Sequence, residues 1–131
     1  NLCKSFVNNK EFLIYGKTYS TKDGTPIRDY IHVTDLAKIH FKLSQKILKK
    51  NYCDVFNCGY GKPISVRKMY DIFSKVSKKK PKIVYKNKRS KDISISISNV
   101  SKLNREIYIN HKESKWLDLA KTSIDWYRNT Q

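Results

Sequence analysis

The chain has 131 residues, of which 39% are hydrophobic, and this size and composition fit one folded domain. No run of the sequence approaches the roughly 20 apolar residues of a membrane-spanning helix, and the first residues do not form a signal peptide. The formal net charge of +17 raises nucleic acid or an anionic membrane as partners. Because most of the basic residues are lysines in a chain that is also rich in Asn, Ile, Ser and Tyr, we favour compositional drift as the cause of the charge.

The three cysteines, Cys3, Cys53 and Cys58, have the spacing of neither a disulfide framework nor a zinc site. We therefore expect a reducing, cytoplasmic compartment and no bound metal. The chain begins with Asn rather than Met, which suggests a fragment, a trimmed chain or a processed chain.

The first half of the chain predicts strand, turn and helix in succession. Residues 10–16 read as a short buried strand, and 22–26 as a turn, because Asp-Gly tolerates positive φ and Pro fixes the exit. An extended segment follows over 27–33. A helix is predicted over 34–49 with Thr34 as its N-cap. Its apolar side chains recur at helical spacing at Leu36, Ile39, Leu43 and Ile47.

The second half continues this alternation, which is typical of the α/β class. Residues 53–58 are predicted to form a strand, and 59–63 a loop. Ser65 is placed to cap a helix that ends near Lys78–Lys80 and Pro81. Three further elements are expected: a strand over 82–85 and helices over 101–106 and 115–128.

The stretch from Asp23 to Ala37, Asp-Gly-Thr-Pro-Ile-Arg-Asp-Tyr-Ile-His-Val-Thr-Asp-Leu-Ala, resembles a signature of the UDP-glucose 4-epimerases, within the extended short-chain dehydrogenase/reductase superfamily. Phe56-Asn-Cys-Gly-Tyr-Gly61, Ser101-Lys102 and Ile124-Asp-Trp-Tyr127 are similar to later parts of the same family. The resemblance covers about residues 10–128.

This resemblance implies an α/β fold: the C-terminal sugar-nucleotide-binding lobe, with short strands and about four helices. Residues 1–131 would be a single substrate-binding domain, and the NAD-binding Rossmann half would be mostly absent. Residues 34–58 would match a helix–strand unit that completes the Rossmann sheet in relatives. The implied activity is that of an isomerase of nucleotide-sugar and galactose metabolism, with a UDP-sugar as the partner.

The resemblance also implies the residues of a UDP-sugar site. Arg28 and Arg89 would hold the phosphates, for which a forked guanidinium is well suited. Asp92 would accept the ribose hydroxyls, and Tyr30 would line the pocket. The loop over 87–92 keeps the family's arginine–aspartate spacing but lacks its leading Pro and its Gly. The implied contacts to uracil come from the strand residues Leu13, Ile14 and Tyr15.

The parts that would carry out the reaction are not recognisable in this sequence. Epimerisation in the family uses NAD, held by a Gly-rich turn, and a Tyr-x-x-x-Lys pair. Gly59-Tyr-Gly61 lacks the third glycine, since position 64 is Ile. Tyr108 and Lys112 have the spacing of the pair but fall in a predicted loop. We therefore assign no catalytic and no cofactor-binding residue: NAD would belong to the full-length parent, and this fragment alone would be inactive.

Other functions compete with this interpretation. The basic stretch Lys78–Lys91 favours a nucleic-acid-binding module, although Tyr85 is the one aromatic residue within it. The chain could also be an inactive remnant of the family, or act on a neighbouring sugar nucleotide. If the helix over 34–49 lacks its usual neighbours, self-association is expected through an exposed apolar stripe at Leu36, Ile39, Leu43 and Ile47.

Overall fold

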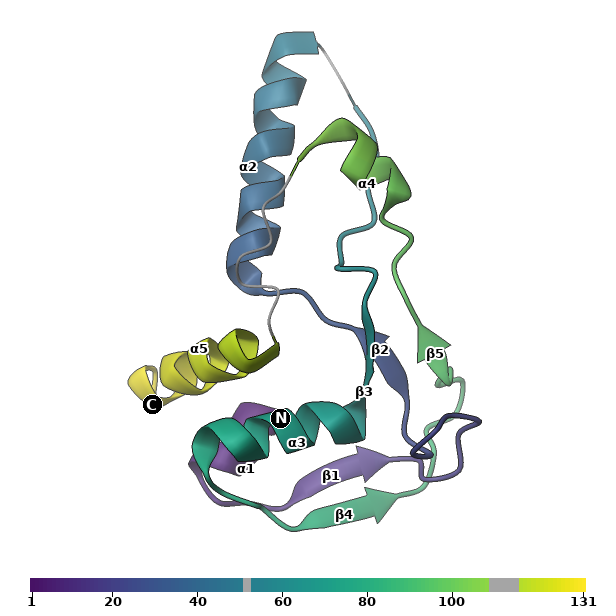
Figure 1. Ribbon diagram of the computed structural model, residues 1–131, viewed down its shortest axis with the longest axis vertical. Helices are drawn as coiled ribbons and strands as arrows, with labels where there is room; N and C mark the ends of the chain where they lie inside the picture. The colour runs from purple at the N-terminus through teal and green to yellow at the C-terminus, as the bar shows by residue number, and fades with distance from the viewer. Residues whose placement is uncertain (51–52, 109–115) are drawn as a thin grey trace.

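A computed structural model describes residues 1–50, 53–108 and 116–131 of the chain. Within these ranges, helices and short strands alternate, so the predicted α/β class is confirmed. The elements, labelled in Figure 1, are α1 (Leu2–Val7), β1 (Phe12–Tyr15), β2 (Ile27–Asp29), α2 (Val33–Lys50), β3 (Pro63–Ser65), α3 (Val66–Ser77), β4 (Ile83–Lys86), β5 (Ile95–Ser96), α4 (Ser101–Glu106) and α5 (Trp116–Asn129). None of the helices in these ranges has the length and apolar character needed to cross a bilayer.

The strands form two small sheets. β1 and β4 are parallel neighbours, with Phe12 opposite Ile83 and Tyr15 opposite Lys86. In the second sheet β2 is central, antiparallel to β3 and parallel to β5. Both sheets join segments that are far apart in sequence, and this pairing brings the chain after β4 close to β1 and β2.

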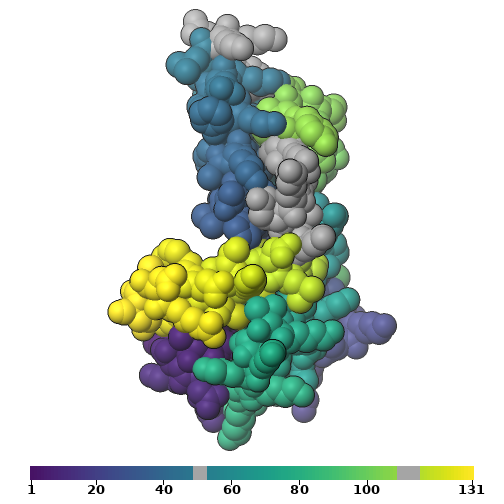
Figure 2. Space-filling view, turned by 60° about the vertical axis from the view of Figure 1, so that its left-hand side comes forward, coloured from purple at the N-terminus to yellow at the C-terminus, as the bar shows by residue number. Residues whose placement is uncertain are grey.

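The main core lies where α1, α3 and α5 meet the first sheet. Helix α5 packs across α1 and α3, as the space-filling view also shows (Figure 2). Aromatic rings fill much of this core, and the centroids of Phe6 and Tyr70 are 5.1 Å apart. The buried residues are Phe6, Phe12, Ile14, Ile64, Met69, Tyr70, Phe73, Leu119, Ala120 and Ile124.

A second, smaller cluster lies at the other end of the elongated molecule, where α2 and α4 lie side by side (Figures 1 and 2). Its buried members are Ile39, Leu103 and Ile107, and Leu43 and Phe56 pack against them. The two clusters are joined through the extended chain on either side of β2, β3 and β5.

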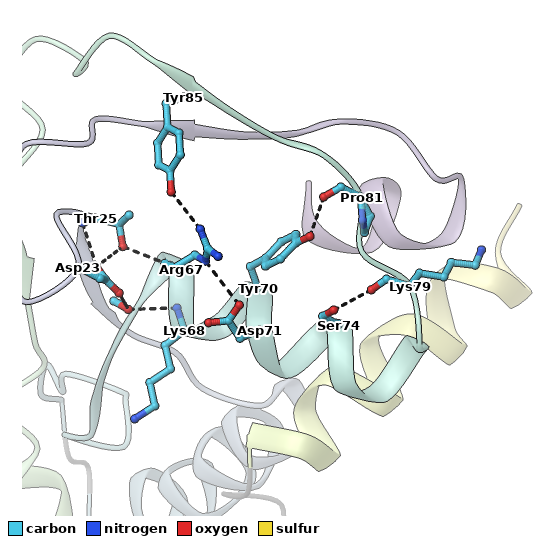
Figure 3. A network of polar contacts seen from close by, with 11 residues as sticks. Asp23, Thr25, Arg67, Lys68, Tyr70, Asp71, Ser74, Lys79, Pro81 and Tyr85 are labelled. Atoms are coloured by element: carbon cyan, nitrogen blue, oxygen red, sulfur yellow. Dashed lines mark hydrogen bonds and ion pairs between the residues drawn. The ribbon is translucent and has the colours of Figure 1, made fainter.

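Helix α3 is anchored at both ends by hydrogen bonds that Figure 3 shows together. The predicted N-cap is confirmed, because the hydroxyl of Ser65 accepts the amide of Lys68 at 3.1 Å. Near the other end the hydroxyl of Ser74 donates to the carbonyl of Lys79 at 2.8 Å, and from the middle of the helix the hydroxyl of Tyr70 donates to the carbonyl of Pro81 at 2.6 Å. Lys78 ends the helix in the left-handed conformation, with φ 56°. These contacts turn the chain back toward β4, whose predicted position is confirmed within one residue.

One predicted strand and the predicted number of helices need correction. Residues 53–58 form no strand, because an extended segment becomes one only when a neighbour shares its backbone hydrogen bonds, and both sheets described here are built from other segments. The described ranges hold five helices rather than about four, since the short helix α1 was not predicted. The helices expected over 101–106 and 115–128 are present as α4 and α5.

The start of α2 also differs from the prediction. The helix begins at Val33, and Thr34 lies inside its first turn rather than at the N-cap. The ring of His32 takes the capping role, since its Nδ1 accepts the amide of Thr34 at 3.1 Å. The other nitrogen of this ring lies 2.7 Å from the hydroxyl of Thr122, which ties the start of α2 to α5.

The predicted exposed stripe on α2 is wrong at Leu36, Ile39 and Leu43 and right at Ile47. Ile39 is fully buried and Leu43 is half-buried, because α4 and Ile107 cover this face. Leu36 is half-buried as well, and Ile47 is 50% exposed. The large apolar side chains that α2 exposes most are Val33 (74%), Phe41 (65%) and Leu48 (86%), and the spacing of Phe41 and Leu48 places them on the face opposite Ile39.

Candidate functional site

A cavity of about 380 Å³ lies beside β1, between β2 and the loop that follows β4. All seven residues of the predicted UDP-sugar site line it, although they come from three separate segments of the chain. The structure therefore brings the complete predicted set together. The lining residues are Asn1, Leu2, Phe12, Leu13, Ile14, Tyr15, Pro26, Arg28, Tyr30, Val66, Arg89 and Asp92.

Arg28 and Asp92 form an ion pair at the edge of the cavity. A terminal nitrogen of Arg28 lies 2.6 Å from one carboxylate oxygen of Asp92, and both side chains are 26% exposed. The other terminal nitrogen donates to the carbonyl of Ile27 at 2.7 Å. The pairing of β5 with β2 explains why two residues so distant in sequence meet, since the amide of Ile27 also donates to the carbonyl of Ser94 at 2.8 Å.

Arg89 reaches the cavity from the loop after β4. Its guanidinium carbon lies 3.9 Å from the centroid of the Tyr15 ring, which is a cation–π contact. The loop turns tightly, with the amide of Asp92 donating to the carbonyl of Arg89 at 3.3 Å. Lys91, at the position where the related loops have Gly, adopts the left-handed conformation with φ 64°. The loop thus keeps a backbone shape that favours glycine without having one.

The strand residues contribute unequally. Leu13 is 39% exposed and Tyr15 is half-buried, whereas Ile14 is 1% exposed and belongs to the main core. This alternation is the normal period of two in a strand. Tyr30 is half-buried, and burial raises the pKa of its hydroxyl while the nearby charge of Arg28 lowers it in part. Its hydroxyl therefore remains protonated at neutral pH.

The structure adds residues that the sequence did not predict. Pro26 and Val66 belong to the cavity lining, because the turn before β2 and the start of α3 pack together there. Tyr19 lies behind Asp92 and donates its hydroxyl to the second carboxylate oxygen at 3.1 Å. No sequence period connects residues 19 and 92. The signal that could have drawn attention to Tyr19 is its place between Gly16 and the turn over 22–26.

The Gly59-Tyr-Gly61 loop does not fit the pyrophosphate of NAD. The amides of Tyr60 and Gly61 donate to the carboxylate of Asp29 at 3.2 and 3.0 Å, and the amide of Ser98 donates to it at 3.3 Å. A Cβ on Gly59 would lie 2.2 Å from the same carboxylate. The donors that could cradle a phosphate are thus committed to the half-buried carboxylate of Asp29, and the loop is structural. The Tyr108–Lys112 spacing extends outside the described residues.

The chemistry of the cavity suits one kind of ligand. Two guanidinium groups favour a multiply charged anion, and a carboxylate accepts hydroxyl groups. Beside them, Leu13, Tyr15 and Tyr30 offer apolar and aromatic surface for a flat ring. A molecule with a diphosphate, a diol and a planar base combines these features. No cluster of three His, Cys, Asp or Glu suited to a metal ion occurs in the part of the chain that the structure describes.

Comparisons with known proteins identify the family. Residues 1–59 match the model of the NAD dependent epimerase/dehydratase family. The UDP-glucose 4-epimerase of Bacillus subtilis (strain 168) is 39% identical over 98 residues, which are 75% of this chain and 29% of that protein.

Solved structures show the same relationship. The UDP-Glc/GlcNAc 4-epimerase from Campylobacter jejuni is 32% identical with a TM-score of 0.86, over 98% of this chain and 39% of that chain. The UDP-glucose 4-epimerase from Bifidobacterium longum, in complex with NAD+ and UDP, is 30% identical with a TM-score of 0.83, over 98% of this chain and 38% of that chain. The chain thus spans less than two fifths of each relative. Through residues 1–59 and this shared fold, it belongs to the NAD dependent epimerase/dehydratase family.

Proposed function

We propose that this chain is the substrate-binding part of a UDP-glucose 4-epimerase and holds the UDP portion of a UDP-sugar in the cavity beside β1. The observation that carries the proposal is the meeting of Arg28, Arg89 and Asp92 at one cavity, although the first is more than 60 residues from the others. A surface arginine or a solvated basic loop would not require this convergence.

The diphosphate would lie between the two arginines. Arg28 is paired with Asp92, so a diphosphate has to take the guanidinium from that carboxylate. The exchange is favourable because the ligand carries more negative charge than one carboxylate and can bind a guanidinium through two oxygens. Asp92 is then available to accept a ribose hydroxyl, and Tyr15 and Leu13 face the base.

Catalysis would depend on polypeptide beyond these 131 residues. NAD supplies reversible hydride transfer in this family. We infer that the glycine-containing loop at residues 59–61 does not hold NAD, since the amides of Tyr60 and Gly61 are bound to Asp29. The reaction proposed for the whole enzyme is the interconversion of UDP-glucose and UDP-galactose in nucleotide-sugar metabolism, and the 131-residue chain would bind without turnover.

Calorimetric titration of the chain with UDP and with UDP-glucose tests the proposal. Arg28→Ala should weaken binding by at least about tenfold, since a charge-assisted pair of hydrogen bonds to phosphate is lost. Arg105→Ala is the matched control. Arg105 is exposed on α4 and does not line the cavity, so its replacement removes the same charge at another place on the molecule. It should bind UDP as the unaltered chain does.

A parallel titration with a single-stranded DNA oligonucleotide at two salt concentrations tests the competing hypothesis of nucleic-acid binding. Binding through the basic stretch Lys78–Lys91 would weaken steeply with salt and would be insensitive to Arg28→Ala. UDP binding that Arg28→Ala and Arg105→Ala reduce equally would overturn the proposed site. Failure of UDP to bind at all would leave the chain as a family remnant without this function.

A further inference from the structure

The hydroxyl of Tyr19 holds Asp92 from the side away from the cavity. It donates to one carboxylate oxygen at 3.1 Å, while Arg28 holds the other oxygen at 2.6 Å. Tyr19 is 6% exposed and is not among the residues that line the cavity. It therefore contacts the carboxylate without being placed to touch a ligand.

The position of the Tyr19 ring is tightly defined. Its backbone amide donates to the carbonyl of Gly24 at 3.1 Å, which fixes the segment against the turn. Gly16, with φ 91°, leaves room for the ring, and a Cβ there would lie 2.2 Å from it. The ammonium of Lys88 lies 4.6 Å from the ring centroid on the loop that carries Asp92. Burial and the hydrogen bond to Asp92 raise the pKa of Tyr19, so the hydroxyl stays a donor.

Binding of a diphosphate changes the situation of Asp92. Once Arg28 turns to the phosphates, the carboxylate loses its ionic partner and lies near new negative charge. A carboxylate without another donor would either stay with Arg28, in competition with the ligand, or turn toward solvent. Tyr19 supplies a donor that the ligand does not take away, and it leaves the oxygen released by Arg28 facing the cavity.

We propose that Tyr19 is a positioning residue that holds Asp92 so that its freed oxygen accepts a ribose hydroxyl, and that it thereby makes the site selective for nucleotides with ribose hydroxyls. This inference rests on the proposed binding of UDP. It extends that proposal by naming the residue that keeps a carboxylate functional next to a diphosphate.

The test compares UDP with 2′,3′-dideoxy-UDP, which carries the same charge and base but neither ribose hydroxyl. The unaltered chain should prefer UDP by about tenfold in calorimetric affinity, and Tyr19→Phe should reduce this preference to about twofold, since a hydrogen bond to a charged group is lost. Asp92→Asn should also reduce it. In the Asp92→Asn background, Tyr19→Phe should change the preference no further, because both residues act through one contact.

Tyr85→Phe is the matched control. It removes a tyrosine hydroxyl from the neighbouring strand β4, where the partner is Arg67 at 3.2 Å (Figure 3), and Tyr85 does not line the cavity. The UDP preference of this variant should equal that of the unaltered chain. A thermal melt of each variant shows whether it is folded, and a merely structural role of Tyr19 would lower the melting temperature without altering the preference.

The possible outcomes distinguish the positioning role of Tyr19 from the proposed binding of UDP. If UDP binds and a folded Tyr19→Phe chain keeps the tenfold preference, the positioning role is wrong and the proposed function stands. If Tyr19→Phe does not fold, the Asp92→Asn chain decides, because an unchanged preference there removes the contact through which Tyr19 would act. If UDP does not bind to the unaltered chain, both the proposed function and this inference are overturned.

Discussion

The guanidinium of Arg89 lies over the ring of Tyr15, 3.9 Å from its centroid, and joins the loop after β4 to the end of β1. The parallel pairing of the two strands ends with Tyr15 opposite Lys86, so the loop leaves the sheet just beside the ring. Among the residues that the structure describes, Arg89 has no acidic partner. A phosphate group would not have to displace a carboxylate from Arg89 as it would from Arg28.

Replacing Tyr15 with Leu should weaken UDP binding by about threefold to tenfold, because the cation–π contact that orients Arg89 is lost. Tyr15→Phe keeps the ring and should bind UDP as the unaltered chain does. Isothermal titration of both variants checks this expectation. Equal affinity in Tyr15→Leu would show that the stack does not orient Arg89 for the ligand.

Lys91→Gly should stabilise the chain by about 0.5–1 kcal/mol. A residue with a Cβ in the left-handed conformation carries a strain of roughly 1–2 kcal/mol, which glycine does not have. Glycine loses more chain entropy on folding, so only part of this strain energy appears as added stability. Urea unfolding measures the difference. Ser90→Gly, one residue earlier and without a positive φ, serves as the control and should give no gain. A gain at Ser90 equal to that at Lys91 would contradict the assigned backbone shape.

Asp29→Ala should lower the free energy of unfolding by about 2–4 kcal/mol, because the amides of Tyr60, Gly61 and Ser98 lose their acceptor. Asp29→Asn keeps one oxygen and should lose less. Urea unfolding followed by circular dichroism provides the measurement. Stability that is unchanged in Asp29→Ala would mean that the amides of the glycine loop remain available for another ligand.

The two faces of α2 should respond differently to truncation. Ile39→Ala should cost about 2–4 kcal/mol because the side chain is fully buried beside Leu103. Phe41→Ala should cost less than about 1 kcal/mol, since Phe41 is 65% exposed two residues away. Unfolding curves of the two variants check the assignment of the faces. The predicted self-association of the chain stays a prediction.

Stability should fall at alkaline pH as Tyr30 ionises. Burial raises its pKa in the folded chain, so above pH 10 the unfolded chain loses this proton first and the folded chain binds more protons. The stabilisation is complete below pH 10 and is lost as the pH rises through the raised value, by at most about 1.4 kcal/mol per pH unit. Urea midpoints between pH 8 and 11 test this. In Tyr30→Phe the decline should be shallower.

Sequence patterns predicted the elements whose causes are local. The helix after Ser65 follows from a cap and from the 3.6-residue period of Met69, Tyr70 and Phe73, and all of these appear as expected. Strand β1 follows from a short apolar run. Strands β3 and β5 were missed because they have three and two residues and exist only through pairing with β2.

These patterns could not predict how the elements pack against one another. Helix α2 carries apolar side chains around much of its circumference, so periodicity could not decide whether Ile39 or Phe41 would be covered; the position of α4 decides it. The predicted site residues were found through a resemblance to relatives and gather at one cavity, but nothing local pairs Arg28 with Asp92 or Tyr19 with Asp92. Those contacts follow from the parallel pairing of β2 with β5.

The division of the buried side chains into a large and a small cluster has a consequence for local unfolding. Among the residues that the structure describes, the small cluster buries three side chains, whereas the core beneath α5 buries ten. A cluster of that size can open while the larger one stays closed. Amide protons in the later turns of α2 and in α4 should therefore exchange with deuterium through local opening, and those of α3 only when the whole chain unfolds. A nucleotide bound beside β1 would slow the exchange of the α3 amides and leave the exchange of the α2 and α4 amides nearly unchanged.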